Sequence, residues 1–229
     1  CGGQHTIVLG IGERLGLTLG AAMLEAVTSA EAVSSDLGRR GEGGTAAWNL
    51  SDVHAGNYDC LMITAGQALA AHKVVLARRS ARLRELISAE ERPGTSEPLE
   101  LLLPELRHDT AMALREYLYT DTISMPLEPG ASLPYDLLSA AENLELPRLA
   151  ALCRNALPVH SLGGVHMPVP PSTLLIDFGG ALGESTWADV KFIAGGRAIY
   201  AHRAILSASS EYFRSMFRSG MREMEHDNR

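Results

Sequence analysis

The sequence predicts an α+β fold made of two related units, and a long internal repeat is the main reason. The stretch from Asp59 to Ile87 returns without a gap as Asp189 to Phe217, at a constant offset of 130 positions (189 − 59 = 130). The identical pairs are Asp59/Asp189, Ile63/Ile193, Gly66/Gly196, Ala68/Ala198, Ala71/Ala201, His72/His202, Leu76/Leu206, Ser80/Ser210 and Arg84/Arg214. A repeat at this distance indicates two domains of one kind rather than a short-period solenoid.

Each copy of the repeat is expected to form a β-hairpin followed by a helical hairpin. In the second copy, the short apolar runs around Val190 and Ile199 are separated by Gly195-Gly196, which predicts two strands joined by a tight turn. After His202 the apolar residues recur every three or four positions, which predicts the apolar face of one or two helices. These residues are Ile205, Leu206, Ser209, Tyr212, Phe213, Met216 and Phe217.

The remaining elements are predicted in chain order. Residues 1–10 are expected to include a short strand, residues 18–37 a helix, and residues 38–44 a flexible Gly-rich linker. After the first copy, alternating leucines up to Pro104 predict a third strand. Three helices follow, over residues 108–120, 134–144 and 146–157, and a Pro/Gly-rich linker covers 158–171.

An acid and a base keep a fixed separation in both copies. Asp59 precedes Lys73 as Asp189 precedes Arg203, fourteen positions in each case (73 − 59 = 14). The spacing suggests an ion pair near a core or an interface, whose disruption if buried typically costs ~3–5 kcal/mol. The alternative is two solvated charges that contribute little. A local basic cluster of Arg78, Arg79, Arg82 and Arg84 is interpreted as a solvated helix face.

The second copy, D-V-x-F…A-H-R-x-I-L-S-A-x-S-x-Y-F-x-x-M-F, resembles the first half of a BTB/POZ domain, and the first copy is a more divergent match. The resemblance implies two BTB/POZ-like domains in tandem, the second truncated, preceded by a helix and a short strand. That strand, Cys-Gly-Gly-x-His-Thr, resembles β-propellers of the regulator-of-chromosome-condensation type. The expected parts are a propeller-type repeat end (1–17), helix and linker (18–50), a first BTB/POZ domain (51–157), a linker (158–171) and the N-terminal part of a second (172–229).

Composition and cysteine usage narrow the function classes. The formal net charge of −7 argues against a nucleic-acid partner, which would need a basic stripe. No apolar run reaches the length of a membrane span. Cys1, Cys60 and Cys153 are too sparse for a disulfide framework, so the cytoplasm or nucleus is expected. No zinc spacing, nucleophile elbow or phosphate loop is present, so we expect neither an enzyme nor a bound cofactor or metal.

The resemblance implies a recognition function. Many BTB/POZ domains dimerise, and many bind the cullin-3 scaffold of ubiquitin ligases while another domain holds a substrate protein. By resemblance, the cullin contact would use Tyr212, Phe213, Met221 and Glu223, where Met221-Arg222-Glu223 occupies the place of the family's hydrophobic-x-Glu motif. The alternative is a frayed, polar helix end. The leading hypothesis is therefore a ubiquitin ligase adaptor, and the others are a structural, self-associating scaffold or a protein that inhibits a kinase directly.

Overall fold

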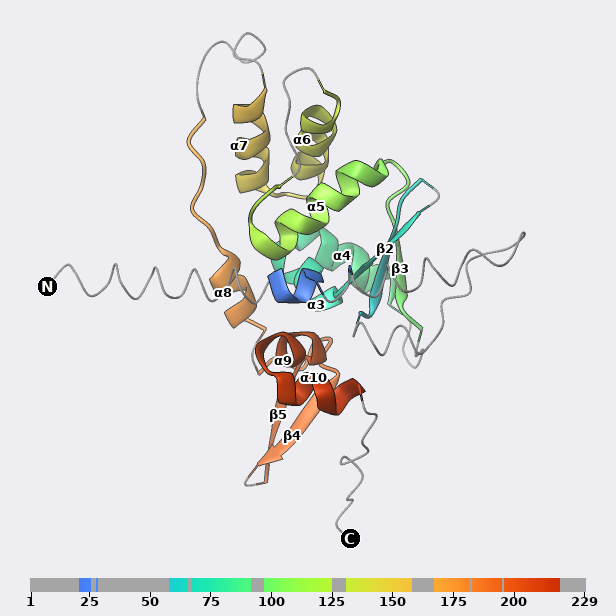
Figure 1. Cartoon of the computed structure of the whole chain (residues 1–229), viewed down its shortest axis with the longest axis vertical. Coiled ribbons are helices and arrows are strands. Elements are labelled where there is room, and N and C mark those ends of the chain that lie inside the picture. Colours follow the sequence, from blue (N-terminus) through green and yellow to red (C-terminus); the bar gives the residue numbers. More distant parts are fainter. Residues whose placement is uncertain are drawn as a thin grey trace, which may run out of the picture.

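The structure is a computed structural model that describes residues 21–25, 28, 58–65, 67–91, 97–124, 131–157, 167–181, 183–194 and 196–218. Figure 1 shows two bodies of different size joined by a short helix. We call residues 58–157 the first unit and residues 183–218 the second unit. The elements of the first unit are β1 Cys60–Ile63, β2 Ala68–Ala71, α3 Lys73–Arg79, α4 Ala81–Glu90, β3 Leu99–Leu102, α5 His108–Thr120, α6 Leu133–Asn143 and α7 Pro147–Ala156.

The sheet of the first unit has the strand order β2-β1-β3. Strands β1 and β2 form an antiparallel hairpin, whereas β3 pairs in parallel with β1. Cys60 at the start of β1 lies opposite Ala71 on one side and Leu99 on the other. Because parallel neighbours need a crossover, the chain passes through α3 and α4 before it returns as β3.

The helices of the first unit enclose one apolar core. Ser80 separates α3 from α4, and its Oγ accepts the Leu83 N–H at 3.0 Å and donates to the Leu144 carbonyl at 2.7 Å. This hydroxyl therefore caps α4 and ties it to the end of α6. Helices α6 and α7 pack against each other, and α5 packs against α6 and α3 (Figure 1). Fully buried core residues include Leu76, Leu83, Leu114, Leu118, Leu137 and Leu149.

The second unit repeats the first half of the first unit. It consists of β4 Val190–Ala194, β5 Arg197–Ala201, α9 Arg203–Ser209 and α10 Glu211–Arg218. Val190 pairs with Ala201 as Cys60 pairs with Ala71, and Gly196 adopts φ 74° in the turn, where glycine is favoured. The matching hydrogen bonds are Lys73 N–H to Asp59 (2.7 Å), Arg203 N–H to Asp189 (2.7 Å), Arg84 Nε to the Ala77 carbonyl (3.0 Å) and Arg214 Nε to the Ser207 carbonyl (3.1 Å).

Residues 167–179, between the two units, contact the first unit near both ends of the segment. Asn155 at the end of α7 holds Met167 through two hydrogen bonds of 2.8 Å, one to its carbonyl and one from its N–H. Helix α8, Leu174–Gly179, then packs against α3. Leu174 and Phe178 are buried in the same apolar cluster as the core of the first unit.

Several predictions fall outside the described residues. These include the propeller-type strand, the linkers over 38–44 and 158–166, and most of the helix over 18–37, of which residues 21–25 and 28 are helical. Met23 on that helix is 1% exposed and belongs to the main core cluster. In the described part of the chain, no helix is long and apolar enough to cross a membrane.

Candidate protein-interaction site

Helix α10 carries a patch of aromatic side chains at the surface of the second unit. The patch consists of Phe192 from β4 and Tyr212, Phe213 and Phe217 from α10. Ring centroids are 5.8 Å apart for Phe192 and Phe213, 5.5 Å for Tyr212 and Phe213, and 6.0 Å for Phe213 and Phe217. Tyr212 is 66% exposed, and the other three rings are half-buried. We call these four residues the aromatic patch.

Local sequence explains why α10 presents these rings. Phe213 and Phe217 are four positions apart and therefore lie on one face of the helix. Arg214 Nε donates to the Ser207 carbonyl at 3.1 Å, which fixes α10 on α9. The Arg203 guanidinium lies 5.4 Å from the centre of the Phe217 ring, a cation–π contact. The patch is thus held by contacts within the second unit.

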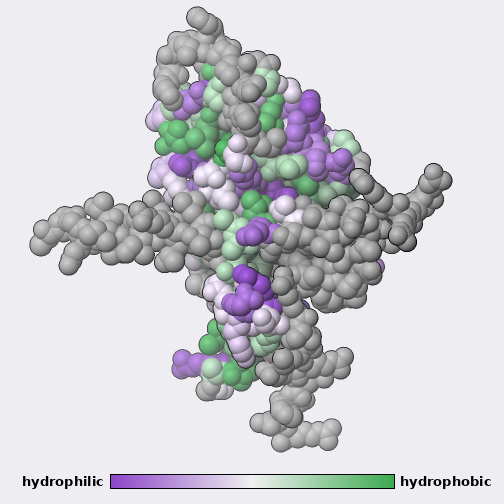
Figure 2. All heavy atoms as spheres, in the orientation of Figure 1, coloured by the Kyte–Doolittle hydropathy of each residue, from purple (hydrophilic) through white to green (hydrophobic). Residues whose placement is uncertain are grey.

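Three of the four equivalent positions in the first unit are completely buried, whereas Tyr212 is replaced there by the exposed Arg82. The equivalents of Phe192, Phe213 and Phe217 are Met62, Leu83 and Ile87, each 0% exposed. In the second unit, apolar exposure continues onto the hairpin, where Ile193 is 66% and Ile199 is 49% exposed. Figure 2 shows hydrophobic surface over β4 and β5 at the lower end of the view. The second unit therefore offers apolar surface that the first unit keeps inside.

The structure brings together only part of the predicted cullin-contact set. Tyr212 and Phe213 are neighbours in the aromatic patch, whereas Met221 and Glu223 lie outside the described residues. Aromatic side chains surrounded by other apolar groups are common energetic centres of protein interfaces. This arrangement suits binding of a protein partner.

The repeated acid binds a backbone N–H in both copies. Asp59 accepts the Lys73 N–H, and the Lys73 ammonium lies 3.3 Å from Glu91. In the second unit, the Arg203 Nε lies 4.0 Å from Asp189, and both side chains are more than one-third exposed. Removal from water raises the pKa of Asp59 to about 6, although the Lys73 N–H and ammonium lower it, and the Asp189 carboxylate adds to the rise.

Each of the two repeated histidines, His72 and His202, forms hydrogen bonds within the fold. Tyr119 Oη is 2.8 Å from His72 Nδ1 and also accepts the His72 N–H at 2.9 Å. His202 Nδ1 lies 3.1 Å from the Trp187 carbonyl. Among the described residues, no three His, Cys, Asp or Glu side chains gather as a metal site requires.

The buried thiol of Cys153 has its pKa raised to about 12 by desolvation.

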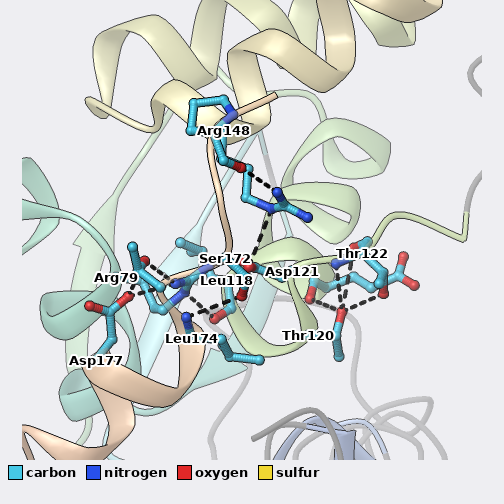
Figure 3. Close-up of polar contacts among 12 residues, drawn as sticks. Arg79, Leu118, Thr120, Asp121, Thr122, Arg148, Ser172, Leu174 and Asp177 are labelled. Carbon is cyan, nitrogen blue, oxygen red and sulfur yellow. Dashed lines mark hydrogen bonds and ion pairs between the residues drawn. The ribbon is translucent and has the colours of Figure 1, made fainter. Parts of the chain in front are cut away.

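Sequence reasoning missed a buried arginine: the interpretation as a solvated helix face is wrong for Arg79, whereas Arg82 and Arg84 are exposed. The Arg79 side chain is 2% exposed and forms ion pairs with Asp121 at the end of α5 and with Asp177 of α8 (Figure 3). Its Nε donates to the Leu118 carbonyl at 3.0 Å. Arg148 of α7 lies 3.4 Å from the same Asp121 carboxylate. The cluster therefore joins α3, α5, α7 and α8.

One signal in the sequence could have indicated this cluster. Arg78 and Arg79 stand where the second copy has Ala208 and Ser209. Arg78 also forms an ion pair with Glu184, which precedes the second hairpin. Arg78 and Arg79, which have no charged counterparts in the second copy, thus form ion pairs with residues that lie between the two copies in the sequence.

Known proteins show similarity to this chain at the level of a domain. The model of the BTB/POZ domain family matches residues 53–161 and 180–229. The chain is 33% identical over 90 residues to a BTB/POZ domain-containing protein of Arabidopsis thaliana, covering 39% of this chain and 46% of that protein. It is 28% identical over 125 residues to zinc finger and BTB domain-containing protein 5 of Mus musculus, covering 55% of this chain and 17% of that protein.

The chain thus spans less than half the length of these two relatives. The BTB domain of human gigaxonin aligns with 50% of this chain and 98% of its own, with 18% sequence identity and a TM-score of 0.37. The family model, in contrast, matches more than half of the chain. This protein therefore belongs to the BTB/POZ domain family.

Proposed function

We propose that this BTB/POZ protein is a substrate adaptor for a cullin-3 ubiquitin ligase and that its second unit makes the cullin contact. BTB/POZ domains are protein–protein interaction modules, and their function is typically not catalytic. The observation that supports the finer assignment is the aromatic patch on α10, where Tyr212 is 66% exposed. Met221-Arg222-Glu223 begins three positions after Arg218, the last residue of α10.

The first unit does not expose apolar side chains at the positions of Phe213 and Phe217. The equivalents of two aromatic-patch residues, Leu83 and Ile87, are inside the core. After them the sequence reads Ser88-Ala89-Glu90-Glu91, which places no apolar anchor in register with Met221. A single cullin contact per chain is therefore the proposed stoichiometry.

Calorimetric titration of the N-terminal region of cullin-3 into the chain tests this assignment. We expect saturable binding at one site, weakened roughly thirtyfold by Tyr212→Ala, since an aromatic hot spot contributes ~2 kcal/mol or more. Glu223→Lys should also weaken binding because it reverses a flanking charge. Tyr135→Ala, another exposed tyrosine on α6, and Glu90→Lys serve as controls. Absence of binding to a folded chain, or equal effects of the controls, would contradict the proposal.

A structural scaffold is the second candidate, supported by the contacts between the two units. BTB domains mediate self-association and protein binding as a family. In this case the interaction surface would organise an assembly without any ligase. Light scattering at two protein concentrations distinguishes pairing between molecules, which raises the mass with concentration, from a monomer of constant mass.

The domain order, a propeller-type strand followed by two BTB/POZ domains in tandem, is also a proposal. Two BTB/POZ domains in tandem after a propeller-type strand resemble the inhibitor of Bruton's tyrosine kinase, and direct kinase inhibition follows from this resemblance alone. Adding the chain to an autophosphorylation assay of that kinase tests it. A rate unchanged at saturating chain concentration would rule out direct inhibition. Imaging of a tagged protein tests the proposed location in the cytoplasm or nucleus.

A further inference from the structure

The contacts between the first copy and the residues that precede the second copy involve charges that the second copy lacks. Arg78 pairs with Glu184, and Arg79 pairs with Asp177 at 2.6 Å. The corresponding residues of the second copy are uncharged. Had the repeat been kept at these positions, α8 and the turn before the second hairpin would have lost both ionic contacts. The first copy therefore differs from the second where it touches the rest of the chain.

Apolar packing continues across the same boundary. Leu174, Phe178 and Ala181 are at most 5% exposed and belong to the core cluster of the first unit. Ala204 of α9 is 8% exposed in this cluster, and Ile205 of α9 packs against it. The core thus runs from the first unit through α8 into α9. A loose tether between independent domains would leave these side chains in water.

Trp187 links both units through its side chain and its backbone. Its Nε1 donates to Glu91 at 3.0 Å, and the same carboxylate pairs with Lys73 of the first copy. Its carbonyl lies 3.1 Å from Nδ1 of His202, the repeated histidine of the second copy. Trp187 has φ 57°, a left-handed conformation that is uncommon for a bulky residue and that surrounding contacts must hold.

We infer that the two units of one chain pair with each other, with α8 and Trp187 filling the α3 side of the first unit in cis. On this side of the first unit, Arg78, Arg79 and Glu91 are bound by Glu184, Asp177 and Trp187 of the same chain. The influence of Asp189 on the pKa of Asp59 is consistent with equivalent ends of the two copies lying near each other. This pairing does not depend on cullin-3 binding.

Cysteine crosslinking in the full chain tests the inference. Arg78→Cys with Glu184→Cys places two thiols at the site of the Arg78–Glu184 ion pair, and Glu91→Cys with Thr186→Cys, next to Trp187, repeats the test while keeping Trp187. Cys1→Ser is included, whereas Cys60 and Cys153 are buried and their raised pKa values disfavour the reactive thiolate. Treatment of a mixture of ¹⁴N- and ¹⁵N-labelled chains with a short bismaleimide then shows which chains are joined.

The expected product is a single chain bridged internally, with no mixed-isotope dimer, in both cysteine pairs. Adding Arg79→Met and Trp187→Ala should lower the bridging yield severalfold, because the pairing would then be weakened. Arg154→Cys with Glu142→Cys, an ion pair within the first unit, is the control that bridges regardless of those changes. Mixed-isotope dimers as the main product, unbridged thiols in both pairs, or a yield insensitive to the weakening substitutions would overturn the inference.

Discussion

Replacing Arg79 by methionine is the sharpest test of how this fold is held together. Methionine keeps a long, unbranched apolar side chain like the stem of arginine, but it lacks the guanidinium that pairs with Asp121. The Asp121 side chain is only 3% exposed. Removing one member of a buried ion pair costs ~3–5 kcal/mol, since the remaining charge is left in a poorly solvated place. Arg148 still lies 3.4 Å from Asp121, so we expect a loss near 3 kcal/mol.

Urea denaturation followed by circular dichroism measures this loss, and calorimetry should show a Tm lower by about 6–12 °C for a chain of this size. Arg82→Met is the matched control because Arg82 is half exposed and pairs only with an exposed Glu85 on its own helix. That pair should contribute ~0–1 kcal/mol. Equal destabilisation by Arg79→Met and Arg82→Met would refute the assignment of Arg79 as a buried structural link. Arg79→Lys should recover only part of the stability, because lysine lacks the planar fork that reaches both acids.

Three further predictions concern the first unit. Burial favours protonated Asp59 in the fold, so wild type should lose up to about 3 kcal/mol of stability as pH rises from about 4 to about 6. Asp59→Asn keeps an acceptor for the Lys73 N–H and should remove this loss. The measurement is the unfolding free energy of wild type and of Asp59→Asn at each pH; a difference between the two proteins that stays constant with pH would contradict the prediction. Tyr119→Phe leaves the buried His72 N–H without its acceptor and should cost ~1–3 kcal/mol in urea denaturation, whereas a neutral effect would show that this bond is dispensable. Leu83→Ala should cost ~2–5 kcal/mol by the same assay, and a value under 1 kcal/mol would argue against its burial.

Local patterns were enough to predict most elements of the fold. The period of the apolar residues predicted a helix over 108–120, and α5 has those bounds. The alternating leucines before Pro104 predicted a strand, and β3 forms there. The repeat predicted the same hairpin and helix pair twice, which both copies adopt. Each of these elements depends on residues close in sequence, so periodicity carries the information.

The contacts of Arg79 and Trp187 could not be predicted in the same way. Arg79 binds acids 42 and 98 positions away, and Trp187 binds Glu91 across 96 positions. An arginine next to another arginine is ordinarily solvated, and only tertiary packing makes this one an exception. For the candidate site, the sequence placed Tyr212 and Phe213 together, but Leu83, the equivalent of Phe213, is buried on a helix that packs against β3, which lies outside the repeat.

The parallel pairing of β1 with β3 has a consequence during synthesis on the ribosome. Strand β2 follows β1 closely, so one edge of β1 can be paired within microseconds of leaving the exit tunnel. The other edge waits for Leu99, which is 39 positions after Cys60 (99 − 60 = 39). At the usual elongation rate this delay is roughly 2–8 s. For that time the nascent chain displays an apolar strand with an open edge, the kind of surface that chaperones bind and that neighbouring nascent chains can pair with.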